Sequence, residues 1–343
     1  MSRRKKWLIA AFSIVVAAVV AAAGAAYYLV LCPMLHIQTP TYIYIDDYDT
    51  YDSVVRKIER EGNAQQLYGL ELIAKYYHYD KKMKTGKYAL QPGDNALTLT
   101  RRLVSGQQTP VKLVIPSVRT LDRLAQTVSK QLMMDSLTLI RILTDSVYCS
   151  DYGYTPQTIC CMFIPNTYQV YWNVSPQKFL ERMQKEHDRF WTNERLEQAT
   201  AIGLSADEVT TLASIVEEET ANDQEKPIVA GLYMNRLQKG MLLQADPTVK
   251  FALQDFTLRR ILNVHLETDS PYNTYKYEEL PPGPIRIPTI KGIESVLHYT
   301  HHNYLYMCAK EDFSGTHNFA SSLSQHLQNA RKYQQALNNR GIR

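Results

Sequence analysis

The sequence predicts an α+β protein with a single amino-terminal transmembrane helix, a small α+β module and a larger mixed α/β domain. Three observations predict this fold class. Residues 7–31 are apolar and carry no charge, and residues 38–108 combine strand and helix patterns within a short length. Residues 109–343 then alternate helical patterns with short strands and proline-containing loops.

The composition is that of a globular protein with a neutral body. Of the 343 residues, 45% are hydrophobic and 21% are charged. The net charge of +4 equals the charge of Arg3, Arg4, Lys5 and Lys6, and the remaining 34 basic residues balance 34 acidic ones. We therefore expect no nucleic-acid partner, because such a partner requires a basic surface.

Residues 7–31 are expected to anchor the chain in a membrane. At about 1.5 Å per residue, a helix of this length crosses a hydrocarbon core of roughly 30 Å. Basic residues precede the segment, and no Lys or Arg follows it until Arg56. The positive-inside rule then places residues 1–6 in the cytoplasm and the rest of the chain outside it. The alternative is a signal peptide cleaved near Ala25.

The region 38–108 reads as one small module. Tyr42 and Tyr44 alternate with apolar residues as in a strand, and Gly62 and Gly106 each end a helical pattern. In chain order we expect a strand, two helices, a strand and a helix, at residues 41–47, 51–61, 65–77, 84–90 and 97–104.

The region 109–343 is predicted to be a mixed α/β domain. A short strand is expected at residues 111–115, and helices are expected within 121–143, at 177–189, around Glu219 and at 223–239. The helix around Glu219 has the clearest start, because Ser205 and Glu208 have the spacing of a capping box.

The cysteines and histidines give no metal-binding pattern. A disulfide in this chain is expected to join Cys149 to Cys160 or Cys161, although five cysteines leave at least one unpaired. No two cysteines are spaced as zinc ligands, and the histidines of residues 298–302 lack the glutamate of a metalloprotease motif. We expect neither a metal nor another cofactor.

Glu219 is the candidate catalytic residue. It shares a helix face with Leu212, Ile215 and Val216, whereas the two preceding glutamates lie off that face. A carboxyl on the buried side of a helix has its pKa raised by desolvation, as a general acid near neutral pH requires. Alternatively, Glu219 is a structural carboxylate that bonds to a turn or pairs with an arginine such as Arg236.

The residues that follow this helix are rich in polar side chains and turns. Loops with Asn, Thr, Tyr and Gln occupy residues 244–249 and 270–275, and prolines set the backbone of residues 280–285. Such side chains supply directed hydrogen-bond donors and acceptors without charge. They suit a ligand rich in hydroxyls and amides, such as a sugar polymer.

These motifs together resemble the endolytic murein transglycosylases, the YceG-like family. The resemblance rests on their order and spacing in Leu212 to Thr220, Asn235-Arg236-Leu237, Gln244 to Val249, Tyr272 to Tyr275, Leu280 to Ile285 and His317-Asn318-Phe319. It implies a helix anchored in the bacterial inner membrane, a LysM-like module and a catalytic domain that cleaves nascent peptidoglycan outside the cytoplasm, in the periplasm where an outer membrane exists. Peptidoglycan synthases are the protein partners that it suggests.

The resemblance also implies roles for individual residues. Glu219 matches the family's catalytic glutamate, as the helix-face argument independently suggests. The residues implied to bind substrate are Glu217, Asn235, Gln244, Asp246, Thr248, Tyr272, Asn273, Tyr275 and His317.

The implied reaction needs a single carboxyl. Glu219 would protonate the oxygen between N-acetylmuramic acid and N-acetylglucosamine, and then deprotonate the muramic C6 hydroxyl, which closes a 1,6-anhydro ring. One alternative is a muramidase that admits water and uses a second acid such as Asp246. Another is a membrane-tethered scaffold that binds peptidoglycan without cleaving it.

Overall fold

The computed structural model describes residues 3–341 and divides the chain into two compact units. The first unit holds the residues up to Leu113 together with Gln131–Met133 and Gln169–Val174. The second holds Val114–Lys130, Met134–Tyr168 and the residues from Ser175 onward. Helices and strands occur in both, as expected of an α+β protein.

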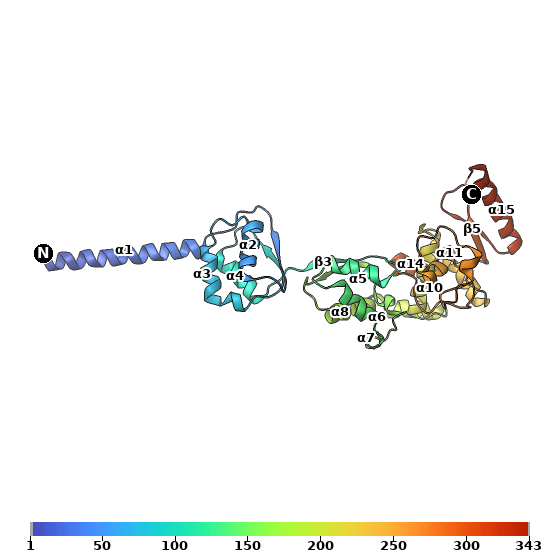
Figure 1. The fold of residues 1–343 in the computed structure, drawn as a ribbon, viewed down its shortest axis with the longest axis horizontal. Coiled ribbons are helices and arrows are strands. Elements are labelled where there is room, and N and C mark those ends of the chain that lie inside the picture. The colour runs from blue at the N-terminus through green and yellow to red at the C-terminus, as the bar shows by residue number, and fades with distance from the viewer. Residues whose placement is uncertain (1–2, 342–343) are drawn as a thin grey trace. The chain divides into compact units, whose positions relative to one another are not determined.

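The first unit begins with α1 (Arg3–Leu31), which Figure 1 shows as one uninterrupted helix. Among the described residues it is the one helix long and apolar enough to cross a membrane, and none of its side chains is buried. Its last turns contact α3 (Tyr68–Tyr77), where a Cβ on Gly69 would lie 1.8 Å from the Leu29 carbonyl oxygen. The two helices therefore approach closely because position 69 is glycine.

The rest of the first unit follows the predicted order of strand, helix, helix, strand and helix. Strands β1 (Thr41–Ile45) and β2 (Gly86–Leu90) pair antiparallel, with Ile43 opposite Tyr88. The helices are α2 (Tyr51–Gly62), α3, the short η1 (Tyr79–Lys81) and α4 (Ala96–Ser105). They cover one face of this sheet, where Ile43, Ile45 and Tyr88 are buried. The prediction placed the start of α3 too early, at residue 65, because Asn63 takes a left-handed conformation that ends α2 and begins a loop.

The structure contains two further short sheets of two strands each. β3 (Val111–Ile115), which matches its predicted range, pairs with β4 (Asn166–Val170), and β5 (Tyr306–Ala309) pairs antiparallel with β6 (His317–Ala320). The helices that follow β3 are α5 (Leu121–Ser129), α6 (Ser136–Thr144), α7 (Ser146–Ser150), η2 (Ile159–Met162), α8 (Pro176–Phe190) and α9 (Asn193–Ala201).

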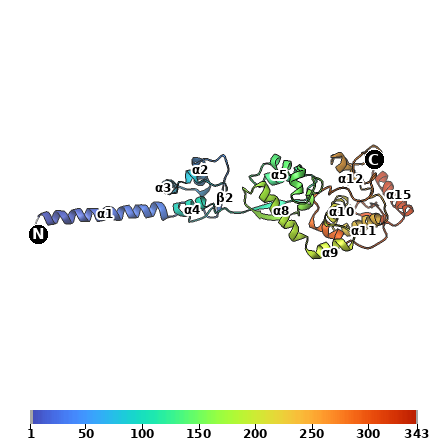
Figure 2. The ribbon, with the colours of Figure 1, turned by 90° about the horizontal axis from the view of Figure 1, so that it is seen from below.

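The core of the second unit is built around α10 (Ala206–Glu219), which packs against α11 (Lys226–Gln238) and α14 (Ile290–Leu297). Figure 2 shows α10 and α11 side by side, with α12 (Asp246–Leu253) nearby. The remaining helices are α13 (Asn263–Leu266) and α15 (Leu323–Asn339). Helix α11 begins at Lys226 and not at the predicted residue 223, because residues 220–225 form a polar connection from α10.

The predicted disulfide is wrong. All five cysteines are free thiols. The Cys149 Sγ lies 3.4 Å from the Leu143 carbonyl oxygen, and the Cys161 Sγ lies 4.0 Å from the Asp207 carbonyl oxygen. Each of these sulfurs therefore contacts a backbone carbonyl group.

Candidate active site

Helix α10 delivers three consecutive glutamates to one end of the core. Its start is the predicted capping box: the Ser205 Oγ accepts from the Glu208 amide at 3.2 Å, and the Glu208 Oε2 accepts from the Ser205 amide at 2.7 Å. From Val209 to Val216 every residue is buried, and the helix ends when Thr220 turns extended. The glutamates therefore occupy its last turn, next to the core.

The first two glutamates are each paired with basic side chains. The Glu217 carboxylate accepts from the Thr289 hydroxyl at 2.8 Å and lies 3.2 Å from the Lys226 Nζ. The Glu218 carboxylate accepts two hydrogen bonds from Arg119, at 2.7 and 2.9 Å, and one from the Arg286 guanidinium, at 2.9 Å.

Glu219 differs, because within residues 3–341 no cation lies within 4 Å of its carboxylate. Its carboxylate accepts a hydrogen bond from the hydroxyl of Tyr233, on α11, at 3.0 Å. The suggested partner Arg236 instead donates to the carbonyl oxygens of Leu242, Leu243 and Leu305. Pairing of Glu219 with Arg236 is therefore wrong.

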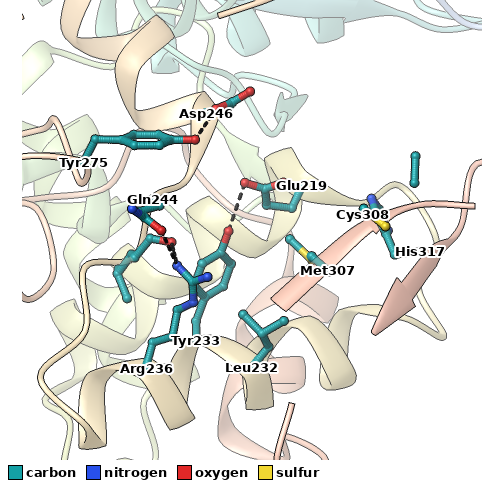
Figure 3. Close-up of a pocket in the computed structure, with 12 residues that line it drawn as sticks. Glu219, Leu232, Tyr233, Arg236, Gln244, Asp246, Tyr275, Met307, Cys308 and His317 are labelled. Carbon is teal, nitrogen blue, oxygen red and sulfur yellow. Dashed lines mark hydrogen bonds between the residues drawn. The ribbon is translucent and has the colours of Figure 1, made fainter. Parts of the chain in front are cut away.

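Glu219 opens on a cavity of about 260 Å³, shown in Figure 3. Tyr233 points its hydroxyl at Glu219 from below, and Tyr275 and Asp246 lie on one side with their own hydrogen bond of 2.6 Å. The full lining is Glu219, Leu232, Tyr233, Arg236, Leu243, Gln244, Asp246, Tyr275, Met307, Cys308, Ala309 and His317. A carboxyl group thus faces a space bordered by both polar and apolar side chains.

Burial is the main cause that raises the pKa of Glu219, to about 7. The Tyr233 hydrogen bond opposes this shift, and the negative charge of Asp246 adds to it. A carboxyl with this pKa is present in both protonation states near neutral pH, so it can donate a proton and later accept one.

The structure gathers only part of the predicted site around this cavity. Apart from Glu219, four of the predicted residues line it: Gln244, Asp246, Tyr275 and His317. Gln244 has a φ of 53°, a left-handed backbone conformation, at the start of the segment that carries Asp246. The Gln244 Oε1 lies 3.3 Å from an Arg236 nitrogen, which holds the amide at the cavity wall.

The two predicted asparagines form hydrogen bonds with backbone carbonyl groups and do not line the cavity. The Asn235 Nδ2 donates to the carbonyl oxygens of His302, at 2.8 Å, and Tyr304, at 3.0 Å. Asn273 is fully buried, and its amide closes its own loop by donating to Leu266 and Thr268 at 2.8 Å. Both side chains fix the loops that carry other site residues.

Three other predicted residues also lie off the cavity lining. The buried Thr248 hydroxyl bonds to the Thr274 hydroxyl at 2.8 Å, and the ring of Tyr272 packs on Phe251 with centroids 4.7 Å apart. Glu217 is held by Thr289 and Lys226, as described above. Their side chains contact protein groups and do not border the cavity.

Sequence reasoning missed Tyr233 and Glu225. Tyr233 lies within the apolar stretch of α11. A buried tyrosine needs a hydrogen-bond partner for its hydroxyl, and this requirement could have indicated a nearby polar group. Glu225 precedes α11 and is buried, and its carboxylate accepts from His317. No pattern near Glu225 pointed to a residue 92 positions away.

Among residues 3–341 no cluster of three or more His, Cys, Asp or Glu side chains is arranged to hold a metal ion.

The chain is similar in both sequence and structure to proteins of one family. The model of the YceG-like family matches residues 43–332. The chain is 30% identical over 286 residues to a protein named endolytic murein transglycosylase from Streptococcus pneumoniae R6, covering 74% of this chain and 51% of that protein. A Bacillus subtilis protein of the same name is 39% identical over 130 residues, which are 38% of this chain and 35% of that protein.

The chain therefore spans about half the length of the pneumococcal relative. Among solved structures, a YceG-like protein from Listeria monocytogenes matches with a TM-score of 0.57 and 26% identity. That match covers 85% of this chain and 99% of the other.

Proposed function

This chain belongs to the YceG-like family, and we propose that it is a membrane-anchored endolytic lytic transglycosylase that acts on peptidoglycan. The names of the relatives from S. pneumoniae and B. subtilis support the reaction class. The single observation that carries the proposal is a glutamate with a pKa of about 7, facing a cavity and bonded to a tyrosine.

The proposed arrangement in the membrane follows the apolar helix α1. Residues 7–31 cross the bacterial inner membrane, residues 1–6 stay in the cytoplasm, and the rest lies outside it, beside peptidoglycan synthases. The length and hydropathy of α1 support this anchor. Residues 38–108 form a LysM-like module and residues 109–343 form the catalytic domain.

In the proposed mechanism Glu219 acts first as a general acid. Its protonated carboxyl donates to the glycosidic oxygen between N-acetylmuramic acid and N-acetylglucosamine as the C1–O bond breaks. Desolvation supports this step, since it keeps a substantial fraction of the carboxyl protonated near pH 7. The Tyr233 hydroxyl then stabilises the carboxylate that results.

Glu219 next acts as a base within the same bound substrate. Its carboxylate takes the proton of the muramic C6 hydroxyl as that oxygen bonds to C1, which gives a 1,6-anhydro end and restores the acid. Positive charge at C1 is stabilised by the nearby carboxylate of Asp246, which Tyr275 holds in place at 2.6 Å. Gln244 and His317 contact the glycan from the cavity wall.

The second candidate function is a hydrolytic muramidase. Asp246 favours it, because a second carboxylate beside the acid could activate a water molecule. The two reactions differ in the origin of the atoms at the new end: hydrolysis adds an oxygen from solvent, whereas ring closure adds none.

Digestion in water enriched in ¹⁸O separates the two candidates. Transglycosylation predicts muramic ends that lack ¹⁸O and are 18 mass units lighter than hydrolysis products made in ordinary water. Reducing ends that carry one ¹⁸O, and that disappear in Asp246→Asn, would favour the muramidase.

A further inference from the structure

A buried carboxylate joins two sides of the Glu219 cavity. Glu225 is 7% exposed and lies between the end of α10 and the start of β6. Its Oε1 accepts from the His317 backbone amide at 2.7 Å. Its Oε2 lies 3.0 Å from the His317 Nδ1 and accepts from the Thr220 hydroxyl at 3.1 Å.

These contacts determine which ring nitrogen of His317 carries hydrogen. An ionised carboxylate only accepts hydrogen bonds, so the Nδ1 that faces Glu225 carries a hydrogen whether the ring is neutral or charged. The nitrogen that remains is Nε2, which in the neutral ring is an acceptor. Within residues 3–341 no group forms a hydrogen bond with this Nε2, and His317 lines the cavity.

Glu225 also connects the elements that carry the other cavity groups. Thr220, which bonds to it, directly follows Glu219, and Glu225 itself immediately precedes α11, which carries Tyr233. The carboxylate therefore fixes His317 relative to both the acid and its tyrosine donor. A neutral residue of the same size in place of Glu225 would keep the shape of the site but would change which nitrogen of the His317 ring carries hydrogen.

We propose that Glu225 is a positioning residue: it holds His317 in the tautomer that carries hydrogen on Nδ1 and presents Nε2 to the cavity as an acceptor for a sugar hydroxyl. This inference rests on the proposed function for the class of ligand, a hydroxyl-rich glycan. It adds a specific contact on the wall opposite Asp246 and Tyr275, as Figure 3 shows.

The direct test is Glu225→Gln. The glutamine Oε1 still accepts from the His317 amide, but its NH₂ group donates to Nδ1, which then must be the bare nitrogen. The ring therefore changes to the tautomer with hydrogen on Nε2. Glu311→Gln is the matched control, because Glu311 is exposed and its carboxylate accepts from the side chain of Asn318, which directly follows His317, at 2.7 Å.

Two measurements on the full-length chain in detergent follow each variant. Nitrogen-15 NMR of the His317 ring should report hydrogen on Nδ1 in the unmodified chain and in Glu311→Gln, and on Nε2 in Glu225→Gln. The affinity for soluble murein glycan fragments is measured in a Glu219→Gln background, where no cleavage interferes. Adding His317→Ala should raise the Kd about tenfold, as for the loss of one hydrogen bond, and adding Glu311→Gln should not.

The outcomes separate this inference from the proposed function. Hydrogen on Nε2 in the unmodified chain, an unchanged tautomer in Glu225→Gln, or an unchanged Kd in His317→Ala would each overturn the inference, even if anhydro ends are formed. Absence of anhydro ends with the expected tautomers and Kd change would overturn the reaction and leave the inference standing. If Glu225→Gln does not fold, the ring nitrogens of the unmodified chain and the Kd of His317→Ala decide it, since that variant must bind about tenfold more weakly.

Discussion

Replacing Glu219 with glutamine should stabilise the chain at alkaline pH. Glutamine keeps the size of the side chain and its hydrogen bond with Tyr233, but it has no charge to bury. The pKa of Glu219 rises from its ordinary value of 4.5 to about 7 on folding, so folding disfavours the charged form. That difference corresponds to about 3 kcal/mol, an upper bound because the carboxyl also opens on a cavity.

The sign of the effect depends on pH in a defined way. Because the folded chain holds this proton more tightly, the unmodified chain loses stability as pH rises from 4.5 through 7. The gain from Glu219→Gln should therefore be near zero at pH 4 and should reach about 2–3 kcal/mol by pH 8.5.

Chemical denaturation of both proteins across this pH range measures the difference. Subtracting the two curves removes every other titrating group. A gain that does not change with pH, or one that falls as pH rises, would refute the claim that burial raises the pKa of Glu219.

Three further predictions follow from single features of the structure. Tyr233→Phe removes a hydrogen bond to the Glu219 carboxylate, so the alkaline limit of activity should move up by about 1 pH unit, and an unmoved pH-rate profile would contradict this. Gly69→Val should destabilise the packing of α1 by about 1–3 kcal/mol, because its Cβ would meet the Leu29 carbonyl oxygen. Gly24→Val is the control and should not destabilise it, because no atom lies within 4 Å of a Cβ at that position. Equal melting temperatures for the two variants would count against this packing. Because the five cysteines are free, a reducing agent should leave the melting temperature unchanged, and a clear fall would reveal a disulfide.

Local signals in the sequence predicted the elements well. The capping box at Ser205, the strand at 111–115 and the apolar helix at the amino terminus depend on residues that are close in the chain. Placement of Glu219 beside the core also followed from one helix face. The starts of α3 and α11 were misjudged because polar connections there contain good helix formers.

Long-range contacts were not predictable in the same way. Asn273 was expected to face a ligand, but a buried amide satisfies backbone groups first, and it closes its own loop. The contact between Glu225 and His317 joins residues that are far apart in sequence, and no sequence pattern at either position predicts the other as its partner. Polar residues in loops thus indicated a site without showing which of them line it.

The most direct test of the central claim is mass spectrometry of peptidoglycan fragments released by the full-length chain and by Glu219→Gln, with Glu311→Gln as the control. The account predicts fragments with 1,6-anhydro-muramic ends from the unmodified chain and from the control, and none from Glu219→Gln. Anhydro ends released at the same rate by Glu219→Gln would contradict the assignment of the acid, and release of reducing ends alone would contradict the reaction.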